Sequence, residues 1–244
     1  MTSSAGLVNG LDTLLPIQGA AVLVPATPTA EELISRQSRR DRFVKRGGDI
    51  VFSLMVLSLG APVLLILAAL VKATSKGPVF YVQQRVGRDY RRFGCIKFRT
   101  MRPDADQVLS KILAESPELE AEFLNDFKLK DDPRITRVGK FLRRSSLDEL
   151  PQFVNVLRGE MSVVGPRPIV DKELPRYGRN MEEVLAVRPG LTGLWQVSGR
   201  NNLSYQKRVR LDVHYARQRT FGLDLRIILR TIGVILDPRD RGAY

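Results

Sequence analysis

The stretch IVFSLMVLSLGAPVLLILAALV, from Ile50 to Val71, decides the fold of this chain because it contains no charged residue. As one straight helix it would be roughly 33 Å long, close to the ~30 Å thickness of the apolar core of a bilayer. Such a stretch is typical of a segment that enters a membrane. A single spanning helix is one interpretation, and a fully buried core helix of a soluble protein is another.

Two features favour a third interpretation, in which the segment turns back inside the membrane. Pro62 lies near the middle of the stretch, where it removes a backbone hydrogen bond and kinks a helix. Basic residues, which mark the cytoplasmic side of membrane segments, flank both ends. They are Arg36, Arg39, Arg40, Arg42, Lys45 and Arg46 before it, and Lys72, Lys76, Arg85, Arg88, Arg91 and Arg92 after it. We therefore expect a re-entrant helix, broken at Pro62, that enters and leaves the same leaflet.

The composition limits both the partners and the chemistry. The 244 residues carry a formal net charge of +13, which suits nucleic acid, an anionic membrane surface or a phosphorylated substrate. Cys95 is the only cysteine, so no disulfide can form within the chain, as expected in a reducing compartment. His214 is the only histidine, which nearly excludes a histidine-based triad or zinc site. The candidate nucleophiles and general acids or bases are therefore carboxylates, hydroxyls, tyrosines or lysines.

The chain divides into three parts. Residues 1–30 contain no Lys or Arg and are rich in small and polar residues, which indicates a flexible tail. Residues 31–76 hold the basic helix and the re-entrant helix. Residues 77–244 form the predicted catalytic domain, an α+β fold dominated by helices with a small β-hairpin or sheet.

Local patterns place the elements of this last part. Residues 79–84 and 93–100 read as the strands of a hairpin, residues 161–164 as a short strand, and residues 188–202 as a loop. Helices are predicted at residues 104–130, 138–144, 149–157, 172–185, 204–218 and 221–236. The last of these is amphipathic, with Asp224, Arg226 and Arg230 on one side, and suits the membrane interface.

The strongest chemical signal is the segment LRRSSLDELPQ, from Leu142 to Gln152. Adjacent carboxylates at Asp148 and Glu149 follow an arginine pair that includes Arg143. A carboxylate can attack phosphorus or hold Mg²⁺, and arginines fork around phosphate oxygens, so the segment indicates phosphoryl chemistry. The alternative is a helix cap, because the stretch that begins at Ser146 matches the S-x-x-E capping box.

Other basic residues could complete an anion site. Arg167 lies between two prolines that stiffen its backbone, and Lys97 and Arg99 alternate with apolar residues on a predicted strand and so share one face. Arg188 and Arg200 bound a glycine-rich segment of the kind that can present backbone N–H groups to phosphate. The alternative for each of these side chains is an ordinary solvated or ion-paired surface position.

Taken together, the motifs of this chain resemble one known family. They are Pro62 in the apolar stretch, KFRTM at 97–101, LRRSSLDELPQ at 142–152, GEMSVVGPRP at 159–168, RPGLTGLWQVSGR at 188–200 and LDVHY at 211–215. The chain resembles the bacterial sugar transferases, which are monotopic polyprenyl-phosphate phosphoglycosyl transferases, over about residues 40–244. It is most similar to the small enzymes that start exopolysaccharide repeat units, typically with galactose 1-phosphate.

The resemblance implies a reaction and a role for each site residue. Such enzymes transfer a sugar 1-phosphate from a UDP-sugar to undecaprenyl phosphate and release UMP. Asp148 would attack the β-phosphate to form a covalent phosphosugar intermediate, and Glu149 would bind Mg²⁺. Positions Lys97, Arg143 and Arg167 would line the phosphate site. Further candidate site residues are Arg99, Arg188, Arg200 and Asp212. The expected location is the bacterial inner membrane, with the catalytic domain facing the cytoplasm.

Two alternatives remain at this point. One is the same reaction with UDP-glucose or a UDP-N-acetylhexosamine, since no residue pattern selects the sugar. The other is a non-enzymatic cationic protein that binds a membrane surface or nucleic acid. We expect no nucleic-acid partner, because aromatic stacking platforms do not alternate with the basic residues.

Overall fold

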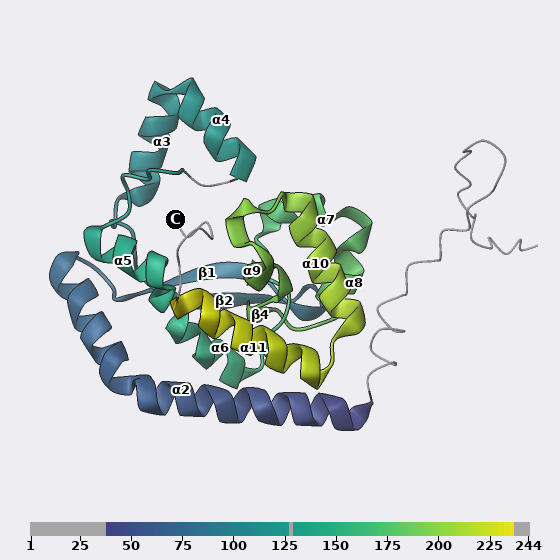
Figure 1. Cartoon of the computed structure of the whole chain (residues 1–244). Helices are drawn as coiled ribbons and strands as arrows, with labels where there is room; N and C mark the ends of the chain where they lie inside the picture. The colour runs from purple at the N-terminus through teal and green to yellow at the C-terminus, as the bar shows by residue number, and fades with distance from the viewer. Residues whose placement is uncertain (1–37, 127–128, 237–244) are drawn as a thin grey trace, which may run out of the picture.

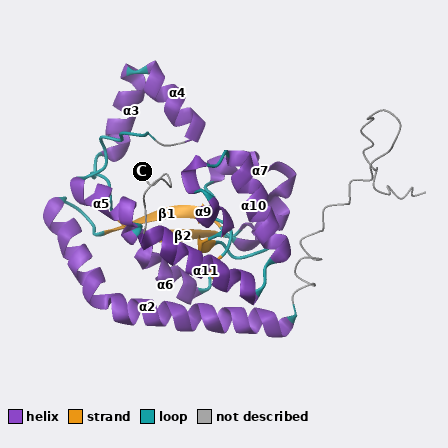
Figure 2. Cartoon of the chain, in the orientation of Figure 1, coloured by secondary structure: helices purple, strands orange, loops and turns teal. Residues whose placement is uncertain are grey.

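The structure is a computed structural model that describes residues 38–126 and 129–236. The predicted tail at residues 1–30 lies outside these ranges. Helices account for most of the described chain, and strands form two sheets of two strands each (Figure 2). The predicted helix-dominated α+β fold with a small sheet is therefore confirmed.

The apolar stretch lies entirely within one long helix, α2 (Arg39–Thr74). The helix begins at Ser38, whose side chain accepts a hydrogen bond from the backbone N–H of Asp41. Its helical assignment continues through Pro62, while Figure 1 shows that the axis changes direction part-way along. A proline bends a helix when it removes one hydrogen bond from an otherwise complete ladder. The predicted break is thus a bend rather than an interruption.

The predicted hairpin is confirmed with slightly different bounds. Strand β1 (Phe80–Val86) pairs antiparallel with β2 (Arg92–Phe98), and the one-turn helix η1 (Arg88–Tyr90) connects them. Tyr81 lies opposite Lys97 in this register, so the two side chains share a face of the hairpin.

The second sheet corrects the sequence-based interpretation of residues 188–202. Strand β4 (Gly190–Thr192) pairs in parallel with β3 (Ser162–Val164), and the short helices α9 (Leu194–Ser198) and η5 (Arg200–Asn202) follow it. Gly165, the residue after β3, lies against the backbone of Gly190. A Cβ atom at Gly190 would overlap Gly165. Gly190 and Gly193, two of the glycines that suggested a loop, are therefore needed for close packing against Gly165.

Shorter helices complete the described chain. They are α3 (Ala105–Glu115), α4 (Pro117–Asp126), α5 (Arg137–Ser145), η2 (Leu147–Gln152), α6 (Phe153–Arg158), η3 (Asp171–Glu173), α7 (Leu174–Tyr177), η4 (Gly178–Asn180), α8 (Met181–Leu185), α10 (Tyr205–Gln218) and α11 (Phe221–Leu236). Figure 1 shows that α3 and α4 project from the body at the end opposite the first half of α2. Residues 104–126 of this helical pair carry seven acidic side chains and one basic one.

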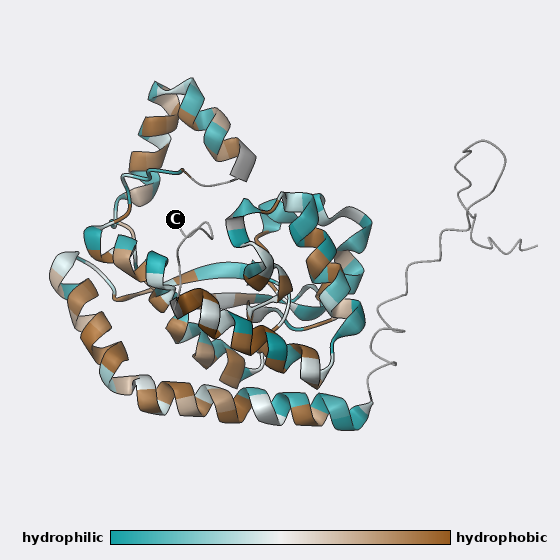
Figure 3. Ribbon diagram, viewed as in Figure 1, coloured by the Kyte–Doolittle hydropathy of each residue, from teal (hydrophilic) through white to brown (hydrophobic). Residues whose placement is uncertain are grey.

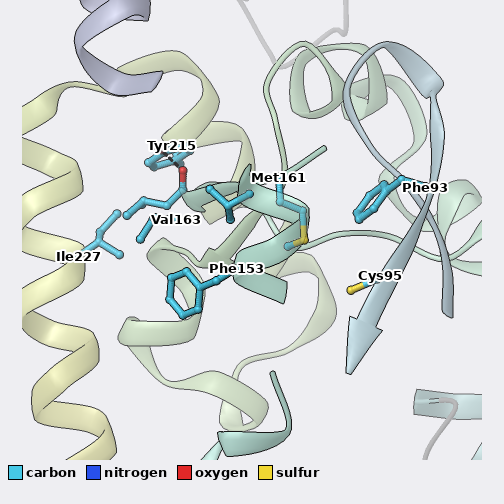
Figure 4. Close-up of a cluster of buried hydrophobic side chains, with 9 residues drawn as sticks. Phe93, Cys95, Phe153, Met161, Val163, Tyr215 and Ile227 are labelled. Carbon is cyan, nitrogen blue, oxygen red and sulfur yellow. Dashed lines mark hydrogen bonds between the residues drawn. The ribbon is translucent and has the colours of Figure 1, made fainter. Parts of the chain in front are cut away.

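The main hydrophobic core lies between the hairpin, α6, β3 and the two C-terminal helices (Figure 4). Phe153, Met161 and Tyr215 converge in it, and Ile227 reaches it from α11. Apolar residues from the first half of α2 pack against the same cluster. This core holds the long helix, the last helix and the strands in one unit.

A buried ionic network also fastens α2 to the body. The ammonium group of Lys45 lies 2.8 Å from an Asp224 carboxylate oxygen and 3.5 Å from Asp49, and it donates to the carbonyl of Val164 at 3.1 Å. The hydroxyl of Tyr215 lies 2.7 Å from the other oxygen of Asp224. Lys45 therefore points inward to protein acceptors, whereas the sequence suggested a charge that flanks the membrane segment.

Arg46, the next residue, is likewise turned toward the body. Its guanidinium donates to the carbonyls of Val156 at 2.5 Å and Leu157 at 2.8 Å. These carbonyls belong to the last turn of α6, where cationic side chains are stabilising. Two of the basic residues before the apolar stretch, Lys45 and Arg46, thus bind the body of the protein.

Helix α11 has the predicted bounds, but one of its charges faces the other way. Arg226 and Arg230 are exposed as expected, together with several large apolar side chains. Asp224 is instead buried, because it is the partner of Lys45 and Tyr215. The prediction that all three charges share one side is therefore wrong.

Candidate active site

A pocket opens on the face of β2 that carries Lys97, between the hairpin and the Gly165–Pro168 turn. One part of its wall is charged and is formed by Lys97, Glu149 and Arg167. The remaining wall is formed by Arg85, Cys95, Gln152, Pro168, Gly190, Leu191 and Gln196. The residues that line the pocket therefore come from both sheets, from η2 and from α9.

The backbone just before the carboxylate pair adopts an uncommon conformation. Ser146 is left-handed, with φ 58° and ψ 16°, where α5 ends and η2 begins. Its hydroxyl makes no helix-capping bond and instead accepts a hydrogen bond of 3.1 Å from Arg200. The capping-box interpretation of Asp148 and Glu149 is therefore wrong. Both carboxylates lie in the first turn of η2, directly after this sharp turn.

Glu149 forms the closest ion pair in the pocket. One of its carboxylate oxygens accepts a hydrogen bond of 2.6 Å from the ammonium of Lys97. Desolvation by itself would raise the pKa of Glu149, but Lys97, together with Arg167 and Arg85, holds it below its usual value. The carboxylate of Glu149 is therefore ionised at neutral pH and faces three cationic groups.

Asp148 is more enclosed than its neighbour, with 8% of its surface exposed. Burial, and after it the charge of Glu149, raises the pKa of Asp148 to about 6, against the opposing charges of Lys97 and Arg143. Asp148 is thus mostly ionised at neutral pH, and its carboxylate is more basic than an ordinary aspartate. Greater basicity generally makes an oxygen a better nucleophile.

Two arginines near the pair are held in fixed orientations. Arg143 donates from Nε to the hydroxyl of Thr100 at 2.9 Å. The guanidinium of Arg167 lies 5.9 Å from the centre of the Trp195 ring, and Arg208 lies 5.3 Å from the same ring. Trp195 is buried, and the surface on which it packs includes the guanidinium of Arg167.

The carboxylates can accommodate a magnesium ion only together with a substrate. Among the residues that the structure describes, no cluster of three or more His, Cys, Asp or Glu side chains is arranged for a metal. Mg²⁺ is often held by one or two carboxylates together with substrate phosphates and water, which Asp148 and Glu149 could supply in part. Because Lys97 occupies an oxygen of Glu149, an ion would have to share or displace that contact. The two carboxylates therefore fit a Mg²⁺ ion whose other ligands are substrate phosphate oxygens and water.

Comparison with known proteins decides the family. The family model described as "Bacterial sugar transferase" matches residues 40–238, which is most of the chain. The chain belongs to the bacterial sugar transferase family.

Individual relatives carry more specific names. The chain is 49% identical over 206 residues to an undecaprenyl-phosphate galactose phosphotransferase of Salmonella typhimurium, which covers 84% of this chain and 43% of that protein. It is 45% identical over 200 residues to the exopolysaccharide production protein ExoY of Rhizobium meliloti, covering 82% and 88%. It is 36% identical over 218 residues to a UDP-glucose:undecaprenyl-phosphate glucose-1-phosphate transferase of Escherichia coli, covering 86% and 43%. The chain thus spans less than half of two of these relatives and most of the third.

In this member of the family, the structure separates the five leading site predictions from the four secondary ones. Lys97, Glu149 and Arg167 line the pocket. Asp148 is close enough to Lys97 and Glu149 for their charges to interact, and Arg143 interacts with Asp148. Sequence reasoning therefore identified residues that the fold brings together.

Two of the secondary candidates lie elsewhere. Arg99 follows the end of β2, is buried, donates to the carbonyl of Ser75 at 2.7 Å and does not line the pocket. Arg188 donates to the carbonyl of Gly159 at 2.8 Å and does not line the pocket. Both arginines join segments of the body.

The other two secondary candidates lie behind the pocket wall. Arg200 contacts Ser146, beside the carboxylate pair. Asp212 is fully buried on α10 and accepts a hydrogen bond of 3.0 Å from the hydroxyl of Tyr177. Burial raises the pKa of Asp212 to about 8, despite the opposing effects of Tyr177 and Arg167, so it is mostly protonated at neutral pH. Neither side chain lines the pocket.

Sequence reasoning missed three polar residues of the pocket wall. Gln152 and Gln196 lie inside motifs that carry the resemblance, DELPQ and WQVSGR, and this position was the available signal. Arg85 was interpreted only as a flanking charge of the membrane segment. It is buried, it donates to the carbonyl of Pro168 at 3.0 Å, and burial lowers its pKa to about 10, with Arg167 as the next cause.

Proposed function

We propose that this chain transfers hexose 1-phosphate from a UDP-sugar to undecaprenyl phosphate and releases UMP, the step that initiates an exopolysaccharide repeat unit. The observation that carries the proposal is the carboxylate pair, Asp148 and Glu149, at a pocket that three cationic side chains line. Family membership and the substrates named for the relatives support it. Galactose is the proposed sugar, and the glucose transferase among the relatives makes glucose the alternative.

The first step is a displacement at the β-phosphorus of the UDP-sugar. A carboxylate oxygen of Asp148 forms a bond to phosphorus, and the bond between this phosphorus and the oxygen that bridges to UMP breaks. UMP leaves with the electron pair of that bond, and the sugar phosphate remains attached to Asp148. Lys97, Arg143 and Arg167 stabilise the negative charge that develops on the phosphate oxygens.

The second step returns Asp148 to its starting state. A phosphate oxygen of undecaprenyl phosphate bonds to the same phosphorus, and the bond from phosphorus to Asp148 breaks. The products are the free carboxylate and undecaprenyl diphosphate sugar. Two displacements allow one pocket to serve a soluble donor and a lipid acceptor in turn.

Magnesium is the proposed cofactor, held by Glu149 and by Asp148 before it reacts. When bound, it would neutralise charge on the two phosphates of the donor. Lys97, which now contacts Glu149, would then be free to donate to a phosphate oxygen.

Release of UMP tests the reaction. Purified protein with Mg²⁺ and undecaprenyl phosphate is expected to release UMP from UDP-galactose, and excess EDTA is expected to reduce release to the rate without enzyme until Mg²⁺ is restored. Parallel reactions with UDP-glucose and a UDP-N-acetylhexosamine identify the preferred sugar. Absence of UMP with every donor, from protein that is folded and lipid-bound, would favour a cationic binding protein without catalytic activity.

We also propose that α2 is a re-entrant membrane helix in the cytoplasmic leaflet and that α11 lies in the interface beside it. By length and composition, α2 is the one described helix that could cross a membrane, and 11% of its most apolar part is buried in the protein. Figure 3 shows apolar residues along most of its length. The large exposed apolar side chains on the two helices are Phe43, Val44, Val51, Leu54, Met55, Leu59, Val63, Leu65, Ile66, Leu70, Phe221, Leu225, Leu229, Ile232 and Ile235. Apolar surface of this extent on a soluble protein would be an aggregation liability.

The re-entrant arrangement predicts that both ends of the chain are cytoplasmic. A protease is expected to remove an N-terminal tag and a C-terminal tag from inside-out membrane vesicles, and to leave both intact in spheroplasts. The bend in α2 makes this possible, because the helix can enter and leave through one surface. Cleavage of one tag in each preparation would show instead that α2 spans the bilayer.

A further inference from the structure

The turn that carries Arg167 is held by side chains on both sides of that residue. Its neighbours Pro166 and Pro168 have no backbone N–H group, so among these three residues only Arg167 can donate from the backbone. That N–H group donates to the carboxyl of Asp212 on α10. The carbonyl of Pro168 accepts a hydrogen bond of 3.0 Å from Nη1 of Arg85 on β1. Two side chains from other elements therefore fix the backbone from which Arg167 projects.

Arg85 is itself fixed by its other contacts. It is buried, and its Nη2 donates to the side-chain oxygen of Gln83 at 2.6 Å. Its Nη1 also lies 3.7 Å from a carboxylate oxygen of Glu173. The same oxygen of Glu173 accepts a hydrogen bond of 3.1 Å from the backbone N–H of Val170, two residues after Pro168. Arg85 and Glu173 thus connect β1 to the backbone that follows Arg167.

The charge of Arg85 opposes the charge of the residue that it holds. Arg85 and Arg167 both line the pocket, and after burial the repulsion by Arg167 is the main reason that the pKa of Arg85 falls to about 10. Arg85 is still charged at neutral pH, whereas a neutral donor could hold the carbonyl of Pro168 without this repulsion. An anion in the pocket offsets repulsion between two cations that face it. The pair therefore suits a pocket that binds the diphosphate of a donor.

We propose that Arg85 is a positioning residue of the active site, which holds Arg167 at the pocket through the carbonyl of Pro168. The inference rests on the proposed function and adds a residue that acts through Arg167 rather than on the substrate. A group that stabilises a reacting phosphate loses most of its effect when it is misplaced by about 1 Å. The contacts of Arg85 therefore matter for the rate as well as for stability.

The fluorescence of Trp195 tests the position of Arg167 without any reaction. Trp195 is the only tryptophan, and the guanidinium of Arg167 lies 5.9 Å from the centre of its ring. A charge at this distance changes the emission of an indole, so Arg167→Met is expected to shift the emission maximum. Arg85→Met should shift it in the same direction, and the double variant should match Arg167→Met alone. Arg217→Met, which removes the partner of Glu183, should keep the wild-type spectrum.

The same variants form a kinetic cycle. Arg85→Met is expected to lower kcat/KM for UDP-galactose by roughly tenfold to a hundredfold, but by less than about twofold when Arg167 is already methionine. Arg85→Lys keeps a cation for Glu173 and so protects the fold if Arg85→Met does not fold. A lysine cannot reproduce the planar fork that joins Gln83 and Pro168, so Arg85→Lys should still lose at least about threefold.

The outcomes separate the inference from the proposed function. An Arg85 effect of equal size with and without Arg167 would overturn the inference, because Arg85 would then act independently. A wild-type spectrum and a wild-type kcat/KM in a folded variant of Arg85 would overturn it as well. Absence of UMP release by every protein, with the emission shifts as expected, would remove the proposed reaction and support the placement of Arg167 by Arg85.

Discussion

Replacing Asp148 by asparagine is expected to abolish UMP release, with a fall in rate of at least about 10³-fold, as is usual when a covalent nucleophile is removed. A carboxamide cannot form the bond to phosphorus on which the first displacement depends. The fold should tolerate the change, because Asp148 is buried in an environment that raises its pKa and so disfavours its charge. Its thermal unfolding midpoint should therefore equal or exceed that of the wild type.

A second measurement isolates the first displacement. Without lipid, the wild type is expected to exchange labelled UMP into UDP-galactose, because the covalent intermediate can react backwards. Asp148→Asn should show no exchange, while Asp171→Asn, at an exposed aspartate paired with Arg92, should exchange normally. Substantial exchange by Asp148→Asn would mean that another group attacks the phosphorus, and Glu149 would be the next candidate.

Replacing Lys45 by methionine is expected to give the largest loss of stability among changes in α2. The substitution leaves Asp49 and Asp224 buried without their cation, and breaking a buried ion pair on one side costs about 3–5 kcal/mol. For a chain of this size the unfolding midpoint would fall by roughly 6–20 °C. The fluorescence of Trp195, the only tryptophan, can follow thermal unfolding in detergent.

Two further variants make the result specific. Arg40→Met removes an exposed positive charge from the same helix and should melt close to the wild type. Combining Lys45→Met with Asp224→Asn removes charges from both sides of the network, so the double variant should lose less stability than the sum of the single changes. If Lys45→Met instead melts together with Arg40→Met, Lys45 is a surface charge and the network contributes nothing.

Features fixed by local sequence were predictable. The helical spacing of apolar residues predicted both ends of α11. The β-branched and aromatic residues on either side of Gly87 predicted the hairpin. The site motifs were also local, since Asp148, Glu149 and Arg143 are neighbours in the chain. Each of these features could be predicted from a few neighbouring residues, because hydrophobic periodicity and turn residues are local properties of the sequence.

Features that depend on distant partners were not predictable. The parallel pairing of β4 with β3 joins segments that are separated by four short helices, and neither strand is long enough to show a period. In the sequence, Lys45 was a charge that flanks the membrane segment and Asp224 was a charge on an amphipathic helix, and only the fold brings them together. Arg99 looked like a further cation of the site, but its side chain donates to the carbonyl of Ser75, which is distant in the sequence.

The acidic helical pair formed by α3 and α4 gives the molecule an electric dipole. Its negative end lies far from the exposed arginines that begin α2, in a chain whose overall charge is strongly positive. If α2 lies in an anionic leaflet as proposed, such a dipole would experience a torque that turns α2 toward the lipid and the acidic pair away from it. The torque acts within a Debye length of roughly 8 Å at physiological ionic strength and weakens as salt rises. The protein would thus be oriented before any apolar side chain touches the membrane.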